Sequence, residues 1–224
     1  MTLRQTTLDD LWDFGDPAAS ERRLREAYDD LGTAEAGNSE TVDAEERREL
    51  RTQIARAMGL QGRFTEAHAV LDALDLDDPV VAVRAALERG RLHNSAGAPV
   101  EAAGHFRKAA ALSAPPASTE LTFLHIDALH MLGIADPANI EDSTARALDE
   151  LSAVDDPRIL RWAVSLNNNL GWARFETGNT DGALEAFHAA ADAADQYGTP
   201  QQQVWAAEAI AEVGAAAGDG DSGS

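Results

Sequence analysis

Histidines and carboxylates are the side chains in this sequence that could bind a metal ion or transfer a proton. The spacing of His125 and His130 places the two rings on different sides of a helix, whereas a helical metal-ligand pair needs a spacing of about three or four residues. His68, His105 and His188 each lie beside an apolar position of helical spacing, which is typical of structural histidines. We therefore expect no metal site.

The carboxylates are too abundant to mark a site by themselves, because the chain has 39 Asp and Glu residues. Asp75, Asp77 and Asp78 resemble a calcium loop, but the glycine and glutamate that such a loop needs downstream are missing. The sequence also has no cysteine, no HExxH, no GxSxG and no glycine-rich phosphate-binding motif. We expect a protein that is not an enzyme and that needs no cofactor.

A net charge of −21 restricts the partners of this acidic chain. Lys108 is the only lysine, and the arginines are interspersed with acids, so we expect no direct binding to nucleic acid. No apolar run is long enough for a transmembrane helix, and the N-terminus lacks the apolar core of a secretory signal. We therefore expect a cytoplasmic protein that does not bind membranes. The excess of Asp with almost no Lys fits either a halophile or a genome of high GC content.

Apolar residues recur at helical spacing along almost the whole chain, and Gly and Pro fall between these runs. Three runs share one template, which consists of a turn glycine, a small residue, a bulky residue and a third apolar residue. Its members are Gly62, Ala67, Leu71 and Leu74, then Gly97, Ala102, Phe106 and Ala109, and finally Gly178, Ala183, Phe187 and Ala190. The template predicts stacked helical hairpins, with the small residue at the close approach of two helices and the bulky residue between hairpins.

A fourth, enlarged copy of the template is expected between the second and the last. Leu132 and Gly133 in this copy match Leu170 and Gly171 in the last one. We predict a widened loop over Gly133–Ile140, followed by a second helix from about Asn139 to Leu151.

The segments from Gly171 to Ala190 and from Gly62 to Pro79 resemble the tetratricopeptide repeat (TPR), a helix–turn–helix unit of about 34 residues. The acidic stretch Leu11–Pro17, together with the segment Leu60–Phe64, also resembles stand-alone prokaryotic repeat proteins. The positions where the family has an early tryptophan hold Arg51, Ala86 and Asn167. The resemblance extends from about Thr41 to Gly214, and it implies an all-α fold. The expected architecture is a right-handed superhelical solenoid of antiparallel helix hairpins, with about four repeats plus capping helices.

We predict three parts of the chain. Residues 1–40 form an apolar and acidic N-terminal segment, a capping helix over Pro17–Leu31 and a loop. Residues 41–217 form the repeat array, closed by a C-terminal capping helix over Gln202–Ala217. Residues 218–224 form a disordered tail.

In tetratricopeptide arrays the first helices of successive repeats line a concave groove that commonly binds a peptide, and the resemblance implies the same here. The candidate groove residues are Thr52 and Arg56 in the first copy, Leu87, Arg91 and Asn94 in the second, Asp127, His130 and Ile134 in the third, and Asn168 and Trp172 in the last. Trp172 and Arg91 are the expected anchors, because a few aromatic and Arg side chains dominate most interfaces. The alternative is that Trp172 and Leu87 only pack between hairpins.

The segment Leu8–Pro17 concentrates apolar side chains outside the repeats, at Leu8, Leu11, Trp12 and Phe14. Three interpretations are open. The segment could be a strap packed on the first hairpin, a built-in ligand in a groove of its own or a neighbouring chain, or an exposed docking motif.

The sequence as a whole favours a non-catalytic protein–protein interaction scaffold that binds a peptide or protein segment in its groove. The alternative is a regulatory sensor that binds a small ligand or signalling peptide there. A homodimer formed through the solenoid ends or the Trp12 segment is a further possibility.

Overall fold

The computed structural model describes residues 5–33, 40–115 and 117–221. Over these residues the chain is entirely helical, without a β-strand, as the sequence pattern predicts. The chain divides into two compact units, unit 1 (Met1–Ala128) and unit 2 (Leu129–Ser224), and the division falls inside helix α7 (Thr119–Ala135).

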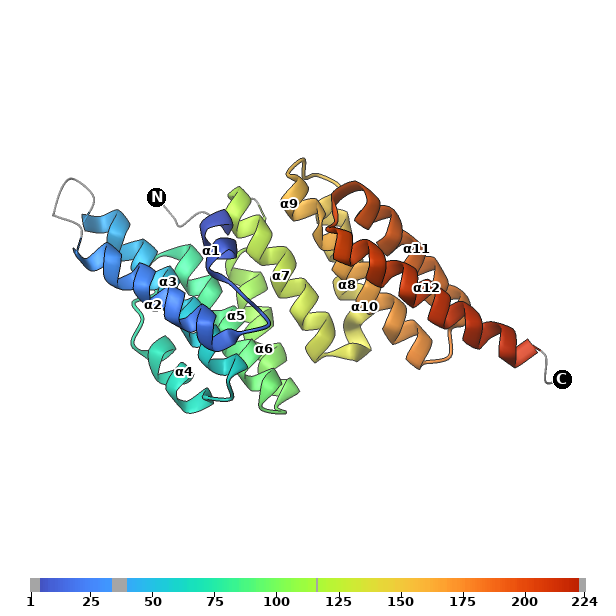
Figure 1. The fold of residues 1–224 in the computed structure, drawn as a ribbon, viewed down its shortest axis with the longest axis horizontal. Coiled ribbons are helices and arrows are strands. Elements are labelled where there is room, and N and C mark those ends of the chain that lie inside the picture. The colour runs from blue at the N-terminus through green and yellow to red at the C-terminus, as the bar shows by residue number, and fades with distance from the viewer. Residues whose placement is uncertain (1–4, 34–39, 116, 222–224) are drawn as a thin grey trace. The chain divides into compact units, whose positions relative to one another are not determined.

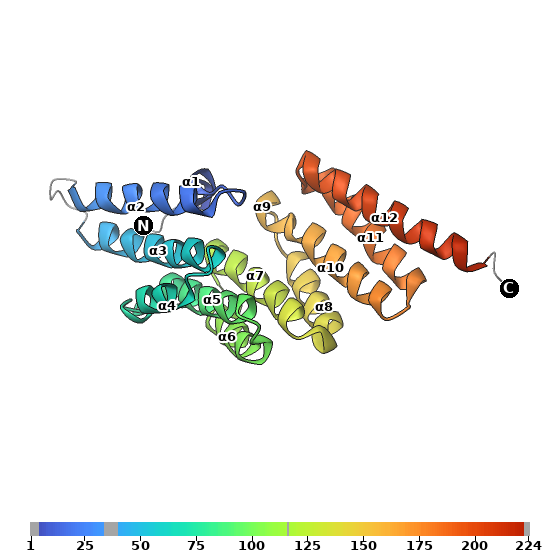
Figure 2. The same cartoon turned by 60° about the horizontal axis from the view of Figure 1, so that its bottom comes forward.

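Unit 1 contains successive antiparallel helices (Figure 1). They are α1 (Gln5–Leu11), α2 (Pro17–Thr33), α3 (Glu40–Leu60), α4 (Phe64–Asp72), α5 (Pro79–Ser95), α6 (Pro99–Leu112) and the first part of α7. Helix α2 packs on α3, α3 pairs with α4, and α5 pairs with α6 (Figure 2). The α3–α4 and α5–α6 pairs are the first two hairpins that the repeated template predicts.

Unit 2 continues from the end of α7 with the same kind of hairpin. Its further elements are the 3₁₀ turn η1 (Pro137–Asn139) and helices α8 (Ile140–Leu151), α9 (Pro157–Leu160), α10 (Trp162–Glu176), α11 (Thr180–Tyr197) and α12 (Pro200–Asp221). Helix α11 packs between α10 and α12, and α8 packs against α10 (Figure 2). The α10–α11 pair is the last copy of the template.

Asp-Pro pairs start three of these helices. The Asp16 side chain accepts a hydrogen bond from the backbone N–H of Ala19 at 2.9 Å, and Asp78 does the same for Val81 at 2.9 Å. Asp156 accepts from the N–H of Arg158 at 2.8 Å. Each carboxylate satisfies a backbone donor of the first turn, while the proline that follows has no donor to satisfy.

The turn glycines of the template adopt the left-handed conformation that their position requires. Gly62, Gly97 and Gly178 have φ values of 74°, 79° and 82°, a region that glycine enters without steric cost. The same turn therefore closes both hairpins of unit 1 and the last hairpin of unit 2.

The burial predicted from the template is confirmed in both units, but Phe106 and Phe187 pack against the first helix of their own hairpin, where the template predicts a place between hairpins. The small residues Ala67, Ala102 and Ala183 and the bulky residues Leu71, Phe106 and Phe187 are all fully buried. A Cβ added at Gly90 would lie 2.4 Å from the Phe106 ring, and one at Gly171 would lie 2.6 Å from the Phe187 ring. Glycine on the first helix thus makes room for the aromatic ring of the second.

The third copy departs from the template at its turn. Helix α7 continues to Ala135, and the short turn η1 replaces most of the widened loop that the sequence predicts. The observed α8 confirms the predicted second helix to within one residue at its start. A Cβ at Gly133 would lie 3.2 Å from the Ile140 side chain, so this glycine packs against the start of α8.

Each unit has a helix near a chain end that the sequence predicts as a cap. Helix α2 is the predicted N-terminal capping helix, and α12 is the predicted C-terminal one, although α12 ends at Asp221 and not at Ala217. Thr199 and Gln202 form a reciprocal capping box at its start, with bonds of 3.0 and 3.2 Å. The rest of the predicted tail, residues 222–224, lies outside the described residues.

Candidate functional site

The ten groove residues predicted from the sequence fall into two sets, one in each unit. Unit 1 contains Thr52, Arg56, Leu87, Arg91, Asn94 and Asp127, and unit 2 contains His130, Ile134, Asn168 and Trp172. The two sets have different surroundings.

Three members of the unit 1 set are buried, namely Thr52, Leu87 and Asp127. Thr52 is fully buried, and its hydroxyl donates to the backbone carbonyl of Glu49 at 2.6 Å. Leu87 is 1% exposed. Neither Thr52 nor Leu87 reaches the surface in this structure. For Leu87 this agrees with the alternative interpretation, in which the side chain only packs between hairpins. Asn94 is half-buried near the end of α5.

Arg91 is held by two carboxylates of its own chain. Its guanidinium donates to both oxygens of Asp127 at 2.6 and 2.7 Å and to Glu88 at 2.7 Å. Burial alone would lower the pKa of Arg91, but the charges and hydrogen bonds of Asp127 and Glu88 outweigh burial and raise it. Arg91 and Asp127, predicted as separate contacts for a partner, therefore bind each other.

Arg56 lies under the N-terminal segment. Its guanidinium is 5.3 Å from the ring centres of both Trp12 and Phe14, which are stacked on each other, and 4.0 Å from Glu88. Burial and the neighbouring Arg91 charge lower the pKa of Arg56. Arg56, which the sequence predicts as a contact for a partner, is thus in contact with Trp12 and Phe14 of its own chain.

The N-terminal segment is packed on its own chain as the strap interpretation requires. Leu8 is fully buried in the core that also contains Leu24 and Leu50. The Trp12 indole N–H donates to the Gln53 side chain of α3 at 3.1 Å. Phe14 is 64% exposed, so it covers Arg56 while facing solvent.

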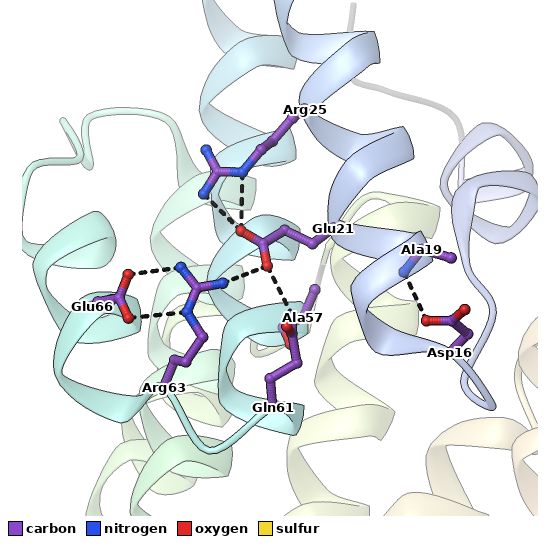
Figure 3. A network of polar contacts seen from close by, with 8 residues as sticks. All are labelled: Asp16, Ala19, Glu21, Arg25, Ala57, Gln61, Arg63 and Glu66. Carbon is purple, nitrogen blue, oxygen red and sulfur yellow. Dashed lines mark hydrogen bonds and ion pairs between the residues drawn. The ribbon is translucent and has the colours of Figure 1, made fainter.

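A polar network around Glu21 attaches α2 to the turn between α3 and α4 (Figure 3). One carboxylate oxygen of Glu21 accepts from Arg25 at 2.7 and 2.9 Å, and the other accepts from Gln61 at 2.8 Å and Arg63 at 2.7 Å. Arg63 also pairs with Glu66. Burial raises the pKa of Glu21, but these hydrogen bonds and the positive charges of Arg25 and Arg63 lower it by more. The net result is a lowered pKa. The network is structural, because its charged groups satisfy one another.

Unit 2 contains an open pocket of about 470 Å³ between the end of α7, α10 and α12. All four predicted residues of this unit line it. Its walls are formed by His130, Ile134, Val164, Ser165, Asn168, Asn169, Trp172, Gln202, Trp205, Ala206, Glu208, Ala209 and Glu212. The sequence alignment of the repeats thus brings residues of α7 and α10 together as expected.

Two tryptophans with different supports dominate the pocket. Trp172 packs edge-on against Phe187, with ring centres 5.0 Å apart, and against Phe175 at 6.1 Å. It therefore belongs to the core of unit 2 as well as to the pocket wall. Trp205 is 57% exposed. An aromatic ring this exposed beside an open pocket offers apolar contact area to a partner.

The α12 side of the pocket was not predicted from the sequence, where this helix was interpreted only as a cap. The positions of Trp205, Glu208 and Glu212 follow a helical spacing that places them on one face. That spacing, directly after the Thr199–Gln202 capping box, is the signal from which this wall could have been found.

Three half-buried histidines form a second cluster, in unit 1. The ring centres of His68 and His93 are 5.1 Å apart, as are those of His93 and His105. Burial lowers the pKa of His68 and of His105, and the neighbouring His93 lowers both further. Within the described ranges, no group of three or more His, Cys, Asp or Glu side chains is placed to hold a metal ion.

Comparison with known proteins gives likenesses in structure. The chain is similar to the crystal structure of BtubC (BKLC) from P. vanneervenii, with a TM-score of 0.66 and 18% sequence identity. The match covers 91% of this chain and 84% of that one. No protein-family model and no curated protein sequence matches the chain. A search of the described residues for membrane-spanning helices found none of sufficient length and apolarity. The likeness to BtubC concerns the fold alone, which is all-helical over the described residues.

Proposed function

We propose that this protein is a non-catalytic, cytoplasmic interaction scaffold that holds a segment of another protein in the unit 2 pocket. We also propose that its hairpins form a TPR-like right-handed solenoid. The single observation that supports the binding function best is Trp205, a large aromatic side chain that is 57% exposed at the wall of an open pocket. Exposed tryptophans in concave surroundings are the usual anchors of protein interfaces.

The other lining groups suit an extended segment. Ile134 and Val164 add apolar surface, and the side-chain amides of Asn168 and Asn169 can donate to and accept from a peptide backbone. A pocket of this composition would bury one apolar or amphipathic side chain of the segment and hold the neighbouring backbone by hydrogen bonds.

The experiment selects peptides from a displayed library on the full chain and measures their affinities by calorimetry. Trp205→Ala should weaken binding by about 2 kcal/mol, the loss typical of an interface anchor, which is about thirty-fold in Kd. Val204→Ala is the matched control, because Val204 is exposed on the same helix but does not line the pocket. Selected peptides that bind the parent and Trp205→Ala equally well would contradict the proposal.

A regulatory sensor for a small ligand is the second candidate. The pocket volume of about 470 Å³ is within the range of small-molecule sites. A small ligand that raises the melting temperature of the parent but not of Trp205→Ala, while no selected peptide competes with it, would favour the sensor over the scaffold.

A further inference from the structure

Helix α12 presents a combined aromatic and acidic face to the pocket. Trp205, Glu208, Ala209 and Glu212 all line it, at the helical spacing that aligns them along one side of α12. Ala209 is buried against the core, whereas both carboxylates are exposed. The pocket therefore has an apolar floor and two negative charges on one wall.

Among the described residues that line the pocket, none is a lysine or an arginine. Arg174, which follows Trp172 closely on α10, is directed elsewhere. Its guanidinium makes two hydrogen bonds of 2.8 Å to Glu141 of α8 and one of 3.0 Å to the carbonyl of Gly182. The negative charges of Glu208 and Glu212 are thus not offset by a lysine or arginine of the wall, and His130 of α7 is the basic side chain that also lines the pocket.

We propose that the segment held in this pocket inserts an arginine side chain, with the guanidinium between the tryptophan surfaces and the carboxylates of Glu208 and Glu212. This inference rests on the proposed function. A guanidinium is planar, stacks on the face of an indole and pairs with carboxylates, so it matches both features of the pocket at once. Trp172 offers a fixed surface because Phe187 and Phe175 hold its ring.

The same physics operates elsewhere in this chain. In unit 1 the Arg56 guanidinium lies 5.3 Å from the Trp12 and Phe14 ring centres and 4.0 Å from the carboxylate of Glu88. There the aromatic rings, the acid and the arginine all belong to the protein. The unit 2 pocket has the rings and the acids, and the arginine would come from the partner.

The probe is a short blocked peptide of glycine and alanine with one central arginine, compared with the same peptide carrying citrulline. Citrulline keeps the shape of arginine and removes its charge. Binding is followed by the indole N–H signals of Trp172 and Trp205 in NMR titrations at low ionic strength. The arginine peptide should bind about tenfold more tightly than the citrulline peptide, as cation–π and ion-pair contacts at a partly exposed site predict.

Variants of the chain separate the pocket from the overall negative charge. The double variant Glu208→Gln and Glu212→Gln should weaken the arginine peptide about tenfold and leave the citrulline peptide unchanged. The matched control, Glu101→Gln with Asp192→Asn, removes two exposed acids outside the pocket and should change neither affinity. Equal binding of the two peptides, or an equal loss in the control variant, would overturn the inference.

Two further outcomes are distinguishable from these. If library-selected peptides depend on Trp205 but not on arginine, the inference fails and the proposed function stands. If sedimentation shows that the parent dimerises and Trp205→Ala is a monomer, a second copy of the chain is the occupant and the inference is overturned.

Discussion

Units 1 and 2 share one hairpin template but differ in what their aromatic and charged side chains contact. In unit 1 the aromatic and charged residues bind one another, with Trp12 bonded to Gln53 and Arg91 paired with Asp127. In unit 2, Trp205 faces solvent beside an open pocket.

The difference teaches that the template fixes the inside of a hairpin and leaves its outer face free to vary. Phe106 and Phe187 occupy the same place in both units and are equally buried. The residue types on the outer face of the hairpins do not repeat between the units, because no shared packing constrains them. Function in this fold therefore has to be sought in side chains outside the template.

The largest expected effects test the shared template. Phe106→Ala and Phe187→Ala should each lower the free energy of unfolding by about 3–5 kcal/mol, since each removes a fully buried ring packed against a glycine. Chemical denaturation followed by circular dichroism measures both. A large loss in one unit and almost none in the other would show that the template does not stabilise both alike.

The next effect tests whether the charged residues of unit 1 are structural. Arg91→Ala should lower the free energy of unfolding by about 3 kcal/mol, because it removes the guanidinium that pairs with two buried carboxylates, Asp127 and Glu88. If Arg91 instead contacted a partner, as the sequence predicts, its truncation would leave the free energy of unfolding unchanged. Arg22→Ala, at an exposed position of α2, is the control and should be neutral. If the two variants were equally stable, Arg91 would not be structural and would again be a candidate contact for a partner.

A smaller effect concerns pH and is specific to unit 1. Burial lowers the pKa of His68 and His105 below the ordinary value of 6.5, and His93 lies between the two rings. The positive charge of Arg89 lowers the pKa of both histidines, and that of Lys108 lowers the pKa of His105. The negative charge of Asp72 acts in the opposite direction on His68.

The unfolded chain thus binds more protons than the folded chain once the pH falls below about 6.5. Stability should therefore be full above this pH and fall as the pH decreases toward 5. Thermal unfolding between pH 7.5 and 5 measures the slope, and His68→Gln with His105→Gln should reduce it. An unchanged slope in this double variant would assign the pH dependence to other groups.

The sequence was sufficient for the helices and for the buried positions of the hairpins, because the turn glycines and the Ala and Phe positions repeat. It predicted one groove of ten residues from aligned positions, and of these His130, Ile134, Asn168 and Trp172 line the unit 2 pocket. The ion pairs of unit 1 were beyond prediction. Whether Arg91 binds Asp127 or a partner depends on the distance between α5 and α7, which no local pattern encodes.

The α12 wall was missed for a different physical reason. Terminal helices of repeat arrays are expected to be polar caps, and Trp205 departs from that expectation. A tryptophan at an exposed helical position costs solubility without adding core packing. Such a position is where a binding role is to be sought in a sequence of this kind.

The central claim is that unit 2 binds a partner while the corresponding side chains of unit 1 serve the fold. Amide hydrogen exchange of the full chain, with and without the tightest library-selected peptide, compares the two units in one measurement. The account predicts that the peptide slows exchange in α10 and α12 and leaves α3 and α5 unchanged. Protection in α3 and α5, or faster exchange in α1 that signals release of the Trp12 segment from Gln53, would contradict it.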